Sequence, residues 1–101
     1  MKWKDSVSFK GLQPQMLLVI ARMEELWRGQ ALVITSANDG THMQNSLHYQ
    51  GLALDFRTKD VLLDKQRLLE DVRAALGRQF DVIFEDPGGP NEHMHVEFDP
   101  K

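Results

Sequence analysis

Two short segments of the sequence carry side chains that bind metals. His48 and Asp55 lie in the first segment, residues 46–55, and His95 lies in the second, near the C-terminus. Two imidazoles and one carboxylate leave a fourth position for water, as in a catalytic zinc site, whereas closed structural sites use four protein ligands, usually with thiolates. The chain has no cysteine. The ligand types therefore predict a catalytic Zn²⁺ site held by His48, Asp55 and His95.

Strands are the elements that must position these ligands. Residues 52–58 and 93–98 alternate between apolar and polar side chains, and residues 80–85 form a short, mostly apolar run. Neighbouring strands lie about 4.8 Å apart, so side chains from two of them can meet at one point. His48 and Asp55 fit neither a helix, which would separate them by roughly 10 Å, nor a straight strand, where an odd spacing gives opposite faces. Gly51 supplies the bend that brings them together.

The rest of the sequence predicts two helices and one more strand around this site. An amphipathic helix is expected over residues 13–28, a strand over 31–36 and a loop over 38–46. A second helix should follow an Asp64 N-cap and end at Gly77. Helices interspersed among strands, with a turn at 86–90, predict an α+β fold with a small, mainly antiparallel sheet and two flanking helices. Residues 1–101 are expected to form a single domain.

Composition restricts the partners that the chain can bind. The net charge is −3 and no basic cluster occurs, so nucleic acid is not an expected partner. The longest apolar run, residues 16–21, is too short to cross a bilayer, so membrane insertion is not expected either. The first residues lack the features of a signal peptide. We therefore expect synthesis as a soluble cytoplasmic protein, with action elsewhere only after release or delivery.

Zinc at such a site lowers the pKa of bound water to about 7 and polarises a carbonyl group. A carboxylate must then accept the proton of that water and pass it on. Glu85 is the favoured base, because it ends the strand expected to pair with residues 93–98. Glu92 is the rival at the loop-to-strand junction, and Glu97 is a weaker third candidate. Both Glu85 and Glu92 could instead be solvated acids at the edge of a loop. Two histidines are candidates for stabilising an oxyanion or donating a proton, His42 and His93.

The spacing Ser46-x-His48-x-x-Gly51-x-Ala53-x-Asp55 resembles the SxHxxGxAxD motif of the D-Ala-D-Ala carboxypeptidase and peptidoglycan endopeptidase family of zinc peptidases. In that family the His and Asp are metal ligands, and a later Glu and His supply the base and the third ligand. The family's ExxH spacing fits Glu92 followed by His95, which leaves the choice between Glu92 and Glu85 open.

The amino-terminal signalling domain of hedgehog proteins shares this fold and is similar around the same residues. The similarity continues at residues 81–85 and at His93-x-His95, and it spans roughly residues 31–99. Many of the peptidases carry an arginine that grips a substrate carboxylate, at a position where this chain has Ala37-Asn38-Asp39. The departure favours an endopeptidase, or another carboxylate anchor such as Arg57.

The resemblance implies a zinc metallopeptidase that hydrolyses peptide bonds of bacterial cell-wall peptidoglycan, as an endopeptidase or a D,D-carboxypeptidase. Its substrate would be a peptidoglycan peptide, and its small size suits a phage-type lytic enzyme or a domain carried by a virion. The alternative is a non-catalytic, zinc-stabilised binding module of the hedgehog type, or a structural part of a larger particle.

Overall fold

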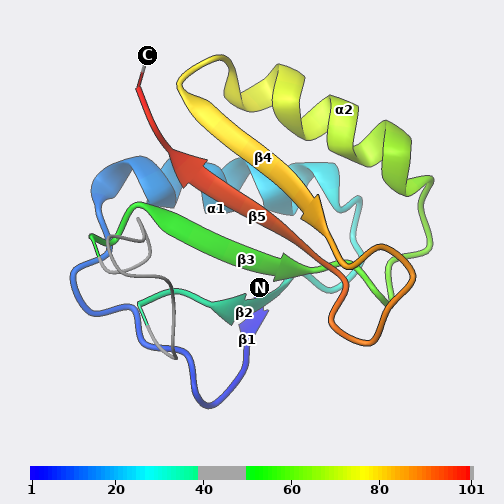
Figure 1. Ribbon diagram of the computed structural model, residues 1–101, viewed down its shortest axis with the longest axis horizontal. Helices are drawn as coiled ribbons and strands as arrows, with labels where there is room; N and C mark the ends of the chain where they lie inside the picture. Colours follow the sequence, from blue (N-terminus) through cyan, green and yellow to red (C-terminus); the bar gives the residue numbers. More distant parts are fainter. Residues whose placement is uncertain (39–49, 101) are drawn as a thin grey trace.

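A computed structural model describes residues 1–38 and 50–100 of the chain. Within these residues, five strands form one sheet in the order β1-β2-β3-β5-β4, accompanied by two helices (Figure 1). The elements along the chain are β1 (Lys2–Trp3), α1 (Pro14–Leu26), β2 (Val33–Ser36), β3 (Ala53–Arg57), α2 (Lys65–Leu76), β4 (Phe80–Glu85) and β5 (His93–Phe98). This architecture confirms the predicted α+β fold.

Helix α1 begins at a proline and packs through an apolar stripe. Pro14 occupies its first turn, where the missing N–H is not needed. Met16, Val19 and Met23 recur at helical spacing and are fully buried. The helix ends before the predicted residue 28, because Arg28 adopts a left-handed backbone with φ of 53°.

Helix α2 is delimited by a polar cap and a glycine, as predicted. The Asp64 side chain accepts a hydrogen bond from the Arg67 N–H at 3.1 Å. Gly77 ends the helix with φ of 84°, a conformation that costs glycine little. The buried side of α2 consists of Leu68, Leu69 and Val72.

One face of the sheet packs against both helices and forms the core. Leu54 and Phe56 of β3 and Met94 and Val96 of β5 are all buried there, in one cluster with α1 and α2 side chains. The fully buried Trp27 packs against Phe56, with ring centroids 6.4 Å apart. Figure 1 shows α1 behind the strands and α2 beside β4. Because side chains alternate along a strand, the polar residues of β3, β5 and β4 lie on the opposite face.

The pairing of the three central strands is antiparallel and fixes which polar residues are neighbours. Asp55 of β3 lies directly opposite His95 of β5. On its other side, β5 pairs with β4, which places Ile83 opposite His95 and Glu85 opposite His93. The strand order thus brings together residues that are far apart in the sequence.

Strand β1 was not predicted from the sequence. It is two residues long and pairs in parallel with β2, so it is too short to show an alternating pattern. The Trp3 side chain is 53% exposed and meets the edge of Phe9, with ring centroids 5.7 Å apart.

Among the described residues, no helix is long and apolar enough to span a membrane.

Candidate metal centre

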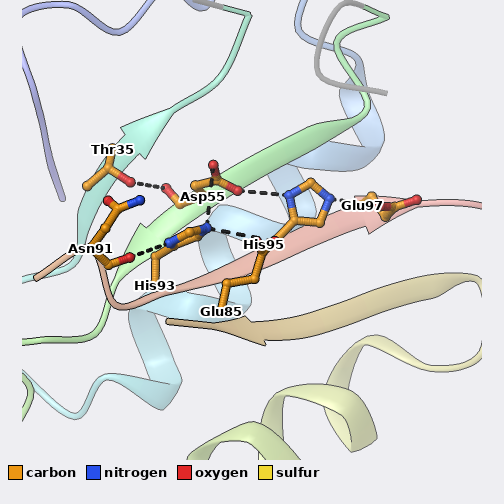
Figure 2. A network of polar contacts seen from close by, with 7 residues as sticks. All are labelled: Thr35, Asp55, Glu85, Asn91, His93, His95 and Glu97. Atoms are coloured by element: carbon orange, nitrogen blue, oxygen red, sulfur yellow. Dashed lines mark hydrogen bonds and ion pairs between the residues drawn. The ribbon is translucent and has the colours of Figure 1, made fainter. Parts of the chain in front are cut away.

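The polar face of the sheet is built around a direct contact between two predicted metal ligands. Nδ1 of His95 lies 2.8 Å from Oδ1 of Asp55 (Figure 2). Both side chains are largely withdrawn from solvent, with 13% and 14% of their surface exposed. A carboxylate can only accept here, so the Nδ1–H of His95 donates the hydrogen bond. The observed register of β3 and β5 therefore brings Asp55 and His95 together.

A second carboxylate holds the other nitrogen of the same ring. Nε2 of His95 lies 2.7 Å from Oε1 of Glu97, two residues along β5 on the same face. Burial lowers the pKa of His95, but the hydrogen bonds and charges of Asp55 and Glu97 raise it more, to about 9. In the metal-free protein at neutral pH, both ring nitrogens of His95 therefore carry a proton.

His93 lies beside this group and is oriented by the main chain. Its Nδ1–H donates to the carbonyl oxygen of Asn91 at 2.7 Å. Its Nε2 is thereby turned toward two carboxylates, 3.9 Å from Asp55 Oδ2 and 3.8 Å from Glu85 Oε1 (Figure 2). The half-exposed Glu85 thus lies at the margin of the group, beside His93.

Glu92 lies on the other side of the sheet and does not join the group. Its side chain reaches Lys65 at the start of α2 and not the polar face. The carboxylate is buried, 2.7 Å from Lys65 Nζ, and accepts a hydrogen bond from the Gly88 N–H at 2.8 Å. Burial raises the pKa of Glu92, but the contacts with Lys65 and Gly88 outweigh burial and hold it below its usual value. Glu92 ties the β4–β5 loop to the start of α2.

The sequence predicted a bend at Gly51, and this residue has a positive φ of 73°. The structure adds a second reason for glycine at this position. A Cβ atom here would collide with the carbonyl oxygen of Gly11, and the Gly51 carbonyl accepts a hydrogen bond from the Gln13 N–H at 2.9 Å. Gly51 therefore also fastens the N-terminal loop to the start of β3.

The donor set of the described residues suits zinc. An imidazole nitrogen and a carboxylate oxygen are common zinc ligands, and here they meet at 2.8 Å on a face that the two helices leave uncovered. Asp55 and His95 would both hold the metal ion, which would replace the proton of their hydrogen bond. The third predicted ligand, His48, lies outside the described residues, as does the predicted site residue His42.

More carboxylates adjoin this group toward one end of the sheet. Carboxylate oxygens of Asp81, Glu97 and Asp99 all lie within 4.8 Å of one another. These carboxylates add negative charge to the end of the face near Glu97.

Sequence reasoning missed two contacts that shape the site. The hydrogen bond between His93 and Asn91 involves a main-chain carbonyl, for which no side-chain pattern exists. Glu97 was considered only as a weak candidate base, although its alternation with His93 and His95 placed it on the right face. The contact with His95 could have been anticipated from that alternation.

Comparison with known proteins identifies the family. Residues 5–96 match the family model of the hedgehog amino-terminal signalling domain. The chain is similar to the Indian hedgehog B protein of Danio rerio, with 38% identity over 72 residues. That alignment covers 69% of this chain and 16% of the relative, so the chain spans only a small part of the relative's length.

These matches contradict the activity predicted from the sequence. The chain matches a signalling domain. The prediction of a hydrolase that degrades bacterial cell walls is therefore wrong, whether as a carboxypeptidase, an endopeptidase or an endolysin. The peptidoglycan substrate and the phage-particle association are wrong for the same reason. The predicted localisation, synthesis in the cytoplasm followed by action on the cell wall, is wrong as well, because the chain matches a signalling domain. The error arose because residue types that can bind a metal, such as those at His48 and Asp55, say nothing about turnover. The chain belongs to the hedgehog amino-terminal signalling domain family.

Proposed function

We propose that this chain is a non-catalytic binding module of the hedgehog type. A zinc ion bound by Asp55 and His95, with His48 as the third ligand, stabilises the polar face of the sheet. The contact between Asp55 and His95 carries the proposal, because it joins two strands whose ligands lie 40 residues apart in the sequence. On this proposal, the motif resembles that of zinc peptidases because it keeps the metal ligands without the peptidase activity.

The face around the metal would bind a protein partner. Next to the partly buried Asp55, His93 and His95 it exposes Ile83, which is 47% accessible, and the half-exposed Glu85. An apolar side chain beside charged groups supplies both buried area and orientation when a partner docks. A receptor exposed on a cell surface is the class of partner that suits a signalling domain.

The first experiment tests zinc as the ligand. Thermal unfolding of the metal-stripped protein is followed with and without zinc, and His95→Ala is compared with the wild type. We expect zinc to raise the melting temperature of the wild type, since a ligand that binds only the folded state stabilises it. His95→Ala should show little or no rise. A wild type that zinc does not stabilise would refute the metal part of the proposal.

The second experiment tests partner binding. Labelled signalling domain of the zebrafish relative is bound to cells that capture it, and the zinc-loaded chain is added as competitor. We expect the wild type to displace the labelled domain. Ile83→Asp should compete at least about tenfold more weakly than the wild type. Leu62→Asp is the matched control, because Leu62 is 88% exposed and lies outside the strands of this face. No displacement by the wild type, or equal loss in both variants, would contradict the proposed binding face.

A further inference from the structure

We propose that Glu97 is the positioning residue of the metal centre. By accepting the Nε2–H of His95, it leaves Nδ1, the nitrogen that faces Asp55, for the metal ion. This inference rests on the proposed zinc site and deepens it, because it states which ring nitrogen binds and what selects it.

The geometry fixes the imidazole ring from both sides. Nε2 is 2.7 Å from Glu97 and Nδ1 is 2.8 Å from Asp55, so the two carboxylates lie at opposite edges of the ring (Figure 2). Glu97 lies opposite Ala53 on β3, a residue too small to compete for the space above the strand. The Glu97 side chain is only 20% exposed, which protects its hydrogen bond from water.

Metal binding requires one tautomer of the ring. A neutral imidazole carries one N–H, and the metal-bound nitrogen must be the other one. An acceptor at Nε2 selects the tautomer in which Nδ1 has a free lone pair, and it raises the basicity of Nδ1. Without Glu97, the ring could turn over and present the wrong nitrogen to Asp55.

Glu97 has a competing explanation in the acidic end of the face. It could serve only to add negative charge next to Asp81 and Asp99, with which its carboxylate is grouped. That role predicts weaker zinc binding when the charge is lost, whether or not a hydrogen-bond acceptor remains. The positioning role predicts that an uncharged acceptor restores part of the affinity and all of the ring orientation.

The test compares the wild type with Glu97→Ala and Glu97→Gln. Zinc affinity is measured by competition with a chelator, and the nitrogen bound to zinc is identified from ¹⁵N chemical shifts of the His95 ring. Glu97→Ala should bind zinc about 10–100-fold more weakly. Glu97→Gln should bind with intermediate affinity and should keep zinc on Nδ1. Glu70→Ala controls for charge, because Glu70 is an exposed carboxylate on α2.

Three results would overturn the inference. Zinc bound through Nε2 in the wild type would contradict the assignment directly. Equal affinity of Glu97→Ala and the wild type would remove the positioning role, and equal loss in Glu97→Ala and Glu97→Gln would leave charge as the whole effect. A wild type that binds no zinc would instead refute the proposed metal site itself. If Glu97→Ala does not fold, the ring assignment and the affinity of Glu97→Gln decide the question.

Discussion

Asp55 of β3 and His95 of β5 face each other across an antiparallel strand pair, and their side chains meet at 2.8 Å. The pairing partner of each residue is determined by the sheet, so the contact does not depend on a flexible loop. A change in register by one residue would put the two side chains on opposite faces. The core packing of β3 and β5 thus holds the two proposed ligands together.

Removing the charge of Asp55 should weaken the binding of both a proton and the metal ion to His95. In Asp55→Asn, the pKa of His95 should fall from about 9 toward its usual value of 6.5, because one of its two anionic partners is lost. Zinc affinity should fall by at least about tenfold, since a zinc ligand is lost. NMR titration of the His95 ring and calorimetry with zinc measure the two effects. Asp60→Asn, which alters an exposed carboxylate near Arg57, should change neither.

Zinc binding should release protons at neutral pH. The metal-free His95 is protonated below a pKa of about 9, so zinc must displace that proton. The apparent affinity should therefore rise by about tenfold for each pH unit between 7 and 8. Calorimetry in buffers with different ionisation enthalpies counts the protons released. Zinc uptake without proton release would show that the metal does not bind at His95.

Without metal, the same histidine should make stability depend on alkaline pH. Its pKa is higher in the folded protein than its ordinary value of 6.5, so folding favours the protonated ring. The stabilisation is fully present below pH 6.5 and is lost as the pH rises through about 9. Urea unfolding between about pH 6 and 10 measures it. His95→Ala should lack this alkaline loss, and an identical loss in the variant would assign it to another group.

The buried ion pair between Glu92 and Lys65 should stabilise the fold at neutral pH. Glu92→Gln should cost about 1–3 kcal/mol, because Lys65 then lacks a charged partner. The pKa of Glu92 is below its usual 4.5, so its contribution is present above pH 4.5 and is lost as the pH falls through the lower folded value. Urea unfolding from about pH 7 down to pH 3 should therefore show the variant and the wild type converging. Glu70→Gln, on the exposed side of α2, should match the wild type throughout.

Two glycines with similar backbone angles should respond differently to alanine. Gly29 has φ of 82° and no atom within 4 Å of the position that a methyl group would take, so Gly29→Ala should cost about 1–2 kcal/mol for the left-handed backbone. Gly51→Ala should cost about 1–3 kcal/mol more, because its methyl group would strike Gly11. Chemical denaturation gives both values. Equal losses would mean that the loop around Gly11 moves aside freely.

The elements of the fold follow from the sequence because they rest on local chemistry. Pro14 and Asp64 mark the starts of the helices, and the apolar run of β4 and the alternation of β5 define both strands to the residue. β1 could not be predicted, because a two-residue strand has no period and depends on tertiary pairing with β2. Helix α1 ends at Leu26, earlier than predicted, because Arg28 adopts a left-handed backbone conformation that its residue type does not reveal.

The candidate site is predictable where strand alternation determines it. His95 and Asp55 were expected to meet, and they do. Alternation does not reach Glu92, which lies outside β5; its contact with Lys65 is what separates it from Glu85. The contact of Glu92 with Lys65 depends on how α2 packs, so no local pattern shows it. Activity was the least predictable property, because a metal-binding motif is compatible with both turnover and binding.

The metal site is tested most directly by locating zinc in crystals of the zinc-loaded protein through anomalous scattering at the zinc absorption edge. The account predicts one strong peak within bonding distance of Asp55 Oδ1 and His95 Nδ1, and its loss in His95→Ala. No peak at this position, or a peak only among Asp81, Glu97 and Asp99, would contradict it.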